Sequence, residues 1–373
     1  MDRETLGVET GAPTADTLAM LERAEGFLRK GEYAECIEAA SQAAISMPNY
    51  FRPHVTIGLA WWRQGDMLNA AESFATSALL NPRHFDSCLY AGRAYMAQSN
   101  YQAARKMFEA ATNADRHSTS CRVWLAHCLQ SLGDFDEANN IIHSTAAQLD
   151  WMLPKNKRIS FQHAPWFLNH IQIWRDKIQP YIPKNGKLLE IGSMEAMSTL
   201  WMASELIDSH GIVVSADIAY RDSYASNIRA SGLRERIISI VGSSVITIPL
   251  LLAGSFDFVY VDGDHSPEMA FADGVNALLA AKQGGIVCFD DYKNQNQDTA
   301  LGVDTLVQCF GQNIDFIHEG YQLIVRRKSD SLVVDFPNNP KLASNMQWRE
   351  AIERSRVQDF SALGSGQLAF SDG

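Results

Sequence analysis

Small and polar residues recur along the first part of the chain with a period of 34 residues. Gly31, Gly65, Ser99 and Gly133 are spaced at this interval, and a short polar turn begins at each of them. A small residue comes seven residues before each turn and another comes five residues after it. Small side chains let two helices approach closely, and a polar turn joins them, so each unit is expected to be a helix hairpin. The pattern predicts four such hairpins over residues 17–150.

This pattern resembles the tetratricopeptide repeat, whose units stack because one hairpin cannot bury its apolar face alone. Pro48 and Pro82 close the first two units, since proline cannot continue a helix. The third unit has Arg116 at that place, and the match weakens near Ile142 in the fourth. The resemblance implies a surface for a protein or peptide partner. The alternative is that the repeats serve only dimerisation or solubility, which leaves a homo-oligomer open.

From Trp151 onward the period of 34 disappears, and short apolar runs alternate with helical segments. Residues 166–182 carry apolar residues at helical spacing and predict a connector helix. Alternating strands and helices are typical of βαβ units and a parallel sheet. The last two runs are separated by only two residues, which predicts an antiparallel hairpin. The seven predicted strands are 187–191, 212–217, 237–241, 256–262, 285–290, 314–318 and 321–327.

The two ends of the chain differ from these regions. Residues 1–16 contain no apolar segment of the kind found in signal peptides, and we expect them to be flexible. The tail has a helix-forming centre near 341–357, and its final Gly/Ser-rich piece is expected to be disordered. The sequence thus predicts a flexible start, a repeat domain, a connector, a sheet domain and a tail. Their bounds are 1–16, 17–150, 151–186, 187–328 and 329–373.

Composition and charge narrow the possible functions. The 373 residues are 46% hydrophobic and 20% charged, which is ordinary for globular proteins of two domains. The formal net charge of −11 argues against nucleic acid or an anionic membrane as the main partner. The six cysteines form no CxxC pair, and no apolar run approaches the roughly 18 residues of a membrane helix. We therefore expect a soluble cytoplasmic protein with reduced cysteines.

The first predicted strand of the second region ends in a turn that leads into a helix. The chain turns at Gly192, in an E-x-G pattern with Glu190 and before Ser193, and ligands of open α/β sheets bind at the carboxyl ends of the strands. The GxGxxG and P-loop patterns are absent, which disfavours a nicotinamide dehydrogenase. Asp217 ends the second strand, about 20 residues beyond the glycine turn, where a carboxylate can accept hydrogen bonds from ribose hydroxyls.

Five segments in order resemble the class I S-adenosylmethionine-dependent methyltransferases: LEIGS, Asp217, GSS, VDGDH and GGIVCFDDY. They are most similar to the branch with DGDH and FDDY motifs, which includes macrolide-sugar and other small-molecule O-methyltransferases. Over about residues 160–328, the resemblance implies a Rossmann-like α/β fold with a mostly parallel seven-stranded sheet and S-adenosylmethionine as cofactor. Ala196 stands where the class often has a further glycine, and its methyl group could crowd the methionine moiety. The cofactor residues that the resemblance implies are Glu190, Gly192, Ser193, Asp217, Gly242, Ser243, Ser244 and Asp262.

Carboxylates follow two of the predicted strands. Asp262 ends the fourth strand, and Asp290 and Asp291 end the fifth. Three converging carboxylates repel one another without a cation, and hard oxygen ligands suit Mg²⁺ or Mn²⁺. In the resembling family, residues at these positions bind a divalent ion, and His265 matches the position of the general base. The alternative is that these are ordinary loop carboxylates that cap helices and bind no ion.

The leading prediction is a repeat module fused to a metal-assisted O-methyltransferase. A metal-bound hydroxyl has a lowered pKa, and His265 would take its proton. Asp262 is the second residue predicted to be catalytic. The acceptor is expected to be a hydroxyl on a sugar, natural product or peptide, with a carboxylate or nitrogen acceptor left open. The alternative function is a non-catalytic interaction scaffold with a degenerate methyltransferase fold, for which Ala196 is the sequence support.

Overall fold

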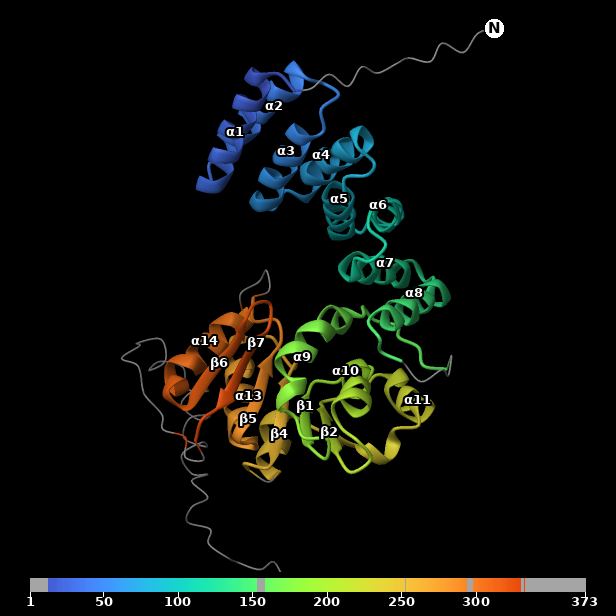
Figure 1. Cartoon of the computed structure of the whole chain (residues 1–373), viewed down its shortest axis with the longest axis vertical. Helices are drawn as coiled ribbons and strands as arrows, with labels where there is room; N and C mark the ends of the chain where they lie inside the picture. Colours follow the sequence, from blue (N-terminus) through green and yellow to red (C-terminus); the bar gives the residue numbers. More distant parts are fainter. Residues whose placement is uncertain (1–12, 153–157, 252, 294–297, 330–331, 333–373) are drawn as a thin grey trace, which may run out of the picture. The chain divides into compact units, whose positions relative to one another are not determined.

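The computed structural model divides into two compact units (Figure 1). It describes residues 13–152, 158–251, 253–293, 298–329 and 332. The first unit comprises the chain up to Asp150 together with Phe161–Asn169. The second comprises Trp151–Ser160 and the chain from His170 onward. The helix predicted near 341–357 lies outside the described residues.

The repeat region forms eight helices paired as four hairpins, as the period of 34 residues predicted. Gly31, Gly65 and Gly133 end the first helices of their hairpins with φ of +79°, +82° and +84°. This left-handed conformation suits glycine and lets the chain reverse into the next helix. Ser99 takes the same conformation with φ of +57°. The helices are α1 (Ala15–Lys30), α2 (Tyr33–Ser46), α3 (Arg52–Gln64), α4 (Met67–Leu80), α5 (Phe85–Ala97), α6 (Tyr101–Ala114), α7 (Thr119–Leu132) and α8 (Phe135–Gln148).

Close packing inside the hairpins explains the small residues of the repeat. A Cβ atom on Gly58 would lie 2.8 Å from the ring of Phe74, and one on Gly92 would lie 2.5 Å from the ring of Phe108. Both distances are shorter than any ordinary carbon–carbon contact, so each phenylalanine uses the space that the missing side chain leaves. Both phenylalanines are fully buried. The repeat period thus follows from how the two helices of one hairpin meet.

The second unit contains a seven-stranded sheet in the order β3-β2-β1-β4-β5-β7-β6. The pairs β1–β2, β1–β4, β2–β3 and β4–β5 are parallel, while β7 is antiparallel to both β5 and β6. The predicted fold class is therefore confirmed. The strands are β1 (Lys187–Ile191), β2 (Ile212–Asp217), β3 (Ile237–Val241), β4 (Phe256–Val261), β5 (Ala281–Phe289), β6 (Ile314–Glu319) and β7 (Leu323–Arg327).

Helices cover the central strands, and every residue of β4 is buried. Strands buried on both faces read as continuous apolar runs, which is why β4 and the second half of β5 were recognisable in the sequence. The helices between the strands are α10 (Met197–Trp201), α11 (Asp222–Ser231), α12 (Ser244–Thr247), α13 (Pro267–Ala280) and α14 (Asp298–Phe310).

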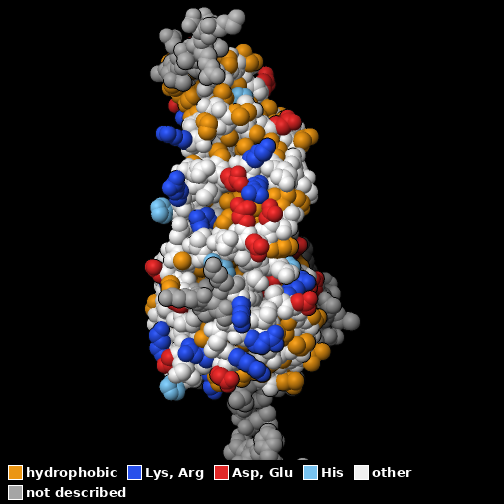
Figure 2. Space-filling view, turned by 90° about the vertical axis from the view of Figure 1, so that its right-hand side faces the viewer, with side chains coloured by type: hydrophobic (Ala, Val, Ile, Leu, Met, Phe, Trp, Pro, Cys, Tyr) orange, Lys and Arg blue, Asp and Glu red, His pale blue; other side chains and the backbone are white. Residues whose placement is uncertain are grey.

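None of the helices among the described residues has the length and apolar character needed to cross a membrane. The face drawn in Figure 2 carries basic side chains beside acidic ones.

The single connector helix predicted over 166–182 is wrong. The structure has a 3₁₀ turn at Trp166–Asn169, the helix α9 at Ile171–Lys177 and a second 3₁₀ turn at Gln179–Tyr181. Pro180 explains the second break, because proline has no N–H to donate and its ring clashes with the preceding turn of a helix. The first break falls where the chain passes from one unit to the other.

Candidate active site

The turn after β1 is enclosed by the neighbouring strand ends. Gly192 has φ of +86°, and a Cβ atom there would lie 1.9 Å from the carbonyl oxygen of Asp262. The Gly192 N–H donates to the carbonyl of Ala216 over 2.8 Å, and the Asp262 N–H donates to the carbonyl of Ile191 over 2.8 Å. Glycine is therefore required at this position by both its conformation and its contacts. The turn lies directly beside the loop that carries Asp262.

Asp217 holds the same turn from the end of β2. Its Oδ2 accepts hydrogen bonds from the N–H groups of Ser193, at 2.8 Å, and Met194, at 3.0 Å. Its Oδ1 accepts from the N–H of Ala219 at 3.2 Å. A carboxylate oxygen can accept more than one hydrogen bond, so Oδ1 keeps capacity for a ligand hydroxyl. The sequence predicts that Asp217 binds the ribose. It did not predict that Asp217 also holds the glycine turn in shape.

Glu190 lies within the protein, with no exposed surface. It accepts hydrogen bonds from the hydroxyls of Ser198 and Thr199, both on α10. Burial raises the pKa of Glu190 to about 7, although the two hydroxyls partly offset that rise. The side chain thus joins β1 to α10. Because Glu190 is buried, it would affect a cofactor only indirectly, by fixing the position of the turn after β1.

Ala196 precedes α10 in a left-handed conformation with φ of +71°, and it is completely buried. Its N–H donates to the carbonyl of Ser193 over 2.7 Å, and its carbonyl accepts from Leu200 over 2.9 Å. An L-residue in this conformation costs roughly 1–2 kcal/mol relative to the right-handed one. The chain therefore keeps the backbone shape that a glycine would favour here.

The turn formed by Gly242, Ser243 and Ser244 lies next to the end of β2. The Gly242 N–H donates to the Asp217 carbonyl over 2.9 Å, which brings the predicted adenine-side turn and the predicted ribose residue together. Two apolar side chains next to this turn and the glycine turn are exposed, Ile218 at 74% and Met194 at 49%. The sequence analysis did not single out either residue. In the sequence, each is an apolar residue that comes directly after the polar residues at the end of a strand.

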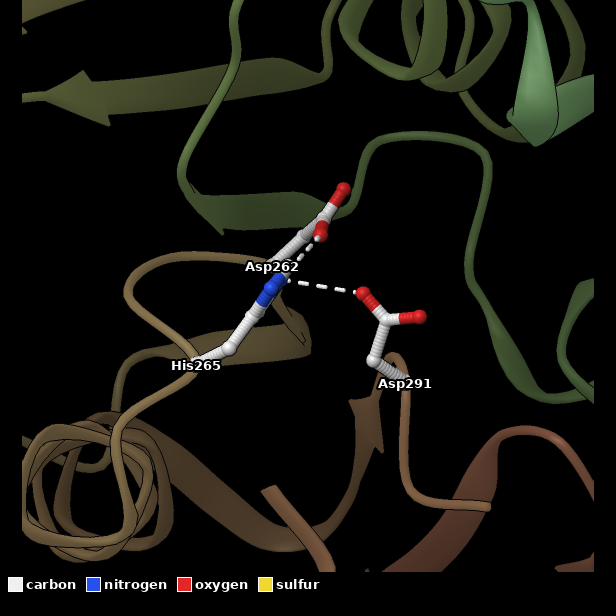
Figure 3. Close-up of side chains that lie close together, drawn as sticks. All are labelled: Asp262, His265 and Asp291. Carbon is white, nitrogen blue, oxygen red and sulfur yellow. Dashed lines mark ion pairs between the residues drawn. The ribbon is translucent and has the colours of Figure 1, made fainter. Parts of the chain in front are cut away.

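Asp262, His265 and Asp291 form a compact cluster from two loops (Figure 3). Asp262 follows β4, His265 precedes α13 and Asp291 follows β5. The His265 Nε2 lies 2.9 Å from Asp291 Oδ2 and 3.9 Å from Asp262 Oδ1. One potential ligand atom from each residue lies within 4.8 Å of the other two. The donor set of two carboxylates and one imidazole fits a single divalent cation.

The charges in this cluster are strongly coupled. Burial raises the pKa of Asp262, and the nearby carboxylate of Asp290 raises it further. Hydrogen bonds to Asp262 and Asp291 raise the pKa of His265. Burial opposes ionisation of Asp291, but its hydrogen bonds with His265 and Tyr321 outweigh this and lower its pKa. The two carboxylates therefore stabilise one positive charge, which in the ion-free protein is the protonated His265.

Asp290 points to different partners. Its Oδ1 accepts a hydrogen bond from the Gln322 Nε2 at 2.8 Å and lies 3.7 Å from the His170 Nε2. Gln322 is fixed in turn by the Trp174 indole, which donates to its Oε1 over 2.8 Å. Asp290 therefore lies beside the cluster of Asp262, His265 and Asp291, and its predicted place among the metal ligands stays a prediction.

Tyr321, in the turn between β6 and β7, contacts the cluster, and the sequence did not reveal this contact. Its hydroxyl donates to Asp291 Oδ1, and its ring stacks on the His170 ring with 5.5 Å between centroids. The antiparallel pairing of β5 with β7, which places Phe289 opposite Leu323, brings this turn to the acidic pair. No local pattern in the sequence predicts that β5 pairs with β7.

Comparisons with known families match both units of the chain. Residues 189–292 match the family described as a methyltransferase domain, and residues 95–150 match a tetratricopeptide repeat family. A catechol O-methyltransferase of Mycobacterium tuberculosis is 29% identical over 109 residues, covering 28% of this chain and 47% of that protein. One from Niastella koreensis is 26% identical over 111 residues, covering 28% of this chain and 48% of that protein. The chain spans about half the length of the curated relatives it matches.

Two solved structures are similar to parts of the chain. The O-methyltransferase from Bacillus cereus in complex with SAH has 19% identity and a TM-score of 0.37, covering 51% of this chain and 89% of that one. The Sgt2 tetratricopeptide repeat domain from Aspergillus fumigatus has 20% identity and a TM-score of 0.30, covering 35% of this chain and 85% of that one. The family matches support tetratricopeptide repeats fused to an O-methyltransferase-like domain.

Proposed function

We propose that this protein is an S-adenosylmethionine-dependent methyltransferase that methylates a hydroxyl on a sugar, natural product or peptide with the help of a divalent ion. One observation carries the proposal. The cluster of Asp262, His265 and Asp291 lies at the carboxyl ends of β4 and β5, and the Asp262 carbonyl lies against Gly192 in the turn after β1. A cofactor bound at the turn and an acceptor bound at the cluster would therefore be neighbours.

The cofactor would occupy the edge of the sheet formed by the turns after β1, β2 and β3. The Asp217 Oδ1 would accept a hydrogen bond from a ribose hydroxyl, and the turn of Gly242, Ser243 and Ser244 would lie against the adenine. The exposed side chains of Ile218 and Met194 offer apolar surface for a flat ring. S-adenosylmethionine supplies a methyl group on a positively charged sulfur, which a nucleophilic oxygen can displace.

The divalent ion would be held by Asp262 and Asp291, with Asp290 as the predicted third carboxylate. Carboxylate oxygens are the ligands that Mg²⁺ and Mn²⁺ prefer. A bound ion supplies Lewis acidity, which lowers the pKa of a coordinated hydroxyl. Asp262 and Asp291 follow β4 and β5, which pair as neighbours in the sheet, and this pairing brings the two carboxylates close together.

Asp262 and Asp291 raise the pKa of His265, and a divalent ion bound to these two carboxylates would reverse that effect, because they would no longer stabilise a charge on the imidazole. The neutral His265 would then accept the proton that the acceptor hydroxyl loses as the oxygen–methyl bond forms. Asp291 orients its imidazole over 2.9 Å, and Tyr321 orients Asp291 through the hydrogen bond to Oδ1. The chain Tyr321–Asp291–His265 thus fixes the base in the way that outer hydrogen bonds fix ligating or catalytic groups elsewhere. His265 is half exposed, which leaves it accessible to a substrate.

The decisive experiment is calorimetry with S-adenosylmethionine, followed by methyl transfer to a catechol with and without Mg²⁺. Catechol is the first acceptor to try because the curated relatives are catechol O-methyltransferases. We expect Asp262→Asn to reduce Mg²⁺-dependent turnover by about 100-fold or more while cofactor affinity stays within a few-fold. Asp264→Asn is the matched control, since Asp264 lies in the same loop but its Oδ1 accepts from the Ser266 N–H at 2.7 Å. Absence of cofactor binding at millimolar concentration would favour the non-catalytic scaffold instead.

The repeats would recruit a protein or peptide partner, or an acceptor carried by one. Stacked hairpins leave one long surface made by their first helices, and repeat proteins commonly bind their partners on such a surface. A pull-down with the full chain, compared with residues 151–373, would test this role. Equal recovery of partners by both would count against it.

A further inference from the structure

Arg93 on α5 is surrounded by aromatic rings from three successive hairpins. Its guanidinium carbon lies 5.0 Å from the ring centroid of Trp62, 5.6 Å from that of Tyr90 and 5.2 Å from that of Trp124. Trp62 belongs to α3, Tyr90 to α5 and Trp124 to α7, so all three rings come from first helices. Each contact is a cation–π interaction, and together they hold the plane of the guanidinium in place.

No described carboxylate pairs with Arg93, and its Nε is buried with no hydrogen-bond partner. Burial lowers the pKa of this guanidinium, which shows that the site disfavours an uncompensated charge. Arg105 of the same module provides a contrast. It pairs with Glu109, Asp134 and Glu137 at 2.8–3.0 Å. Arg93 is therefore a preoriented cation without an anion.

Two further features lie on either side of Arg93 in the order of the repeats. Towards the C-terminal end, the Trp166 ring contacts that of Trp124 with 4.6 Å between centroids, and 38% of Trp166 is exposed. Towards the N-terminal end lies a cavity of about 330 Å³ between α1, α3 and the start of α5. Its wall contains Arg29, Arg52, Arg63 and Glu25, and Arg52 pairs with Glu25 at 2.9 Å, so two arginines remain as the excess.

We infer that this first-helix surface binds an acidic peptide segment, with the Arg93 guanidinium receiving one of its carboxylates. Arginine binds carboxylates through two parallel N–H donors, and the rings already fix the plane from which those donors project. The excess of arginine in the cavity between α1, α3 and the start of α5 favours further acidic residues in the same segment. A single free guanidinium between rings suits one carboxylate better than the repeating phosphates of a nucleic acid, which need a row of cations. The inference rests on the proposed role of the repeats and adds the chemistry of the partner.

The test is fluorescence anisotropy with the full chain and a fluorescein-labelled hexaglutamate peptide at low ionic strength. Labelled hexaglutamine is the uncharged control, and oligothymidylate tests the nucleic-acid alternative. We expect saturable binding of hexaglutamate that weakens with added salt, and little binding of hexaglutamine or oligothymidylate. Arg93→Gln should raise the dissociation constant by about 10- to 100-fold, which corresponds to one hydrogen-bonded charge pair. Arg105→Gln, which removes a guanidinium that already has acidic partners, should leave it unchanged.

Arg93→Lys keeps the charge but loses the planar fork, so it should bind hexaglutamate with intermediate affinity. It also serves as the test if Arg93→Gln melts at a lower temperature than the wild type. Equal affinity of the wild type and both Arg93 variants would overturn the inference, and so would a lack of hexaglutamate binding or preferential binding of oligothymidylate. Calorimetry with S-adenosylmethionine on the same samples separates this outcome from a failure of the methyltransferase proposal, because Arg93 belongs to the other unit.

Discussion

Removal of one hydroxyl, by Tyr321→Phe, tests the hydrogen bonds that support the acidic cluster. The hydroxyl donates to Asp291 Oδ1, while Asp291 Oδ2 lies 2.9 Å from the His265 Nε2. Loss of this donor leaves Asp291 held from one side only. The phenyl ring of the variant can still stack on His170 as the phenol does. The substitution therefore removes the hydrogen bond with little change in packing.

The size of the effect follows from the surroundings of the bond. A hydrogen bond to a charged group contributes about 1.5–3 kcal/mol when buried. Tyr321 is 48% exposed, so water can replace part of the lost interaction and we expect the lower end of that range. The hydrogen bond from Tyr321 helps to lower the pKa of Asp291, so its loss should raise that pKa. Loss of such an outer hydrogen bond typically weakens metal binding by about 10-fold or more.

The assay is Mn²⁺ binding followed by electron paramagnetic resonance, with Tyr292→Phe as the matched control. The Tyr292 hydroxyl donates to Asp304 at 2.7 Å, so the control also removes one tyrosine–aspartate hydrogen bond. We expect Tyr321→Phe to weaken Mn²⁺ binding about 10-fold and Tyr292→Phe to leave it unchanged. Equal affinities in the two variants would refute the supporting role of Tyr321. Failure of the wild type to bind Mn²⁺ would refute the ion site itself.

Three further predictions follow from single positions. Gly192→Ala places a Cβ atom 1.9 Å from the Asp262 carbonyl, so it should abolish S-adenosylmethionine binding in calorimetry; retained affinity would mean that the turn is not the cofactor site. Gly92→Ala should destabilise the repeats by about 1–3 kcal/mol in urea unfolding, because the added Cβ atom would lie 2.5 Å from the Phe108 ring. Gly26→Ala is the control: the nearest neighbour of its Cβ atom would lie 3.9 Å away, so it should stabilise α1 by about 0.5–1 kcal/mol. The raised pKa of Glu190, about 7 instead of 4.5, means that the folded protein keeps a proton that the unfolded chain releases. Stability should therefore fall as the pH rises from 4.5 to 7, by on the order of 3 kcal/mol, and Glu190→Gln should remove this slope from denaturation curves measured across that window.

The sequence by itself determined the repeat module and most of the sheet. Gly31, Gly65 and Gly133 mark hairpin turns because a reversal between two helices needs a left-handed residue, and that requirement is local. The first three strands have the predicted bounds, since a buried parallel strand reads as an apolar run. Gly192 and Asp217 stood out because the ends of such strands often carry the polar groups of a ligand site, and their part in binding a cofactor stays a prediction.

The tertiary structure decided how these groups meet. Asp291 contacts His265 and Tyr321, which come from different loops and lie 26 and 30 residues away in the sequence. Asp290 instead accepts from Gln322, although it neighbours Asp291 and looked equivalent to it in the sequence. Both outcomes depend on the antiparallel register of β5 and β7, which is set by hydrogen bonds between distant segments. A side-chain pattern of short period predicts the face and the end of a strand, but the partner of that strand follows only from the packing of the whole sheet.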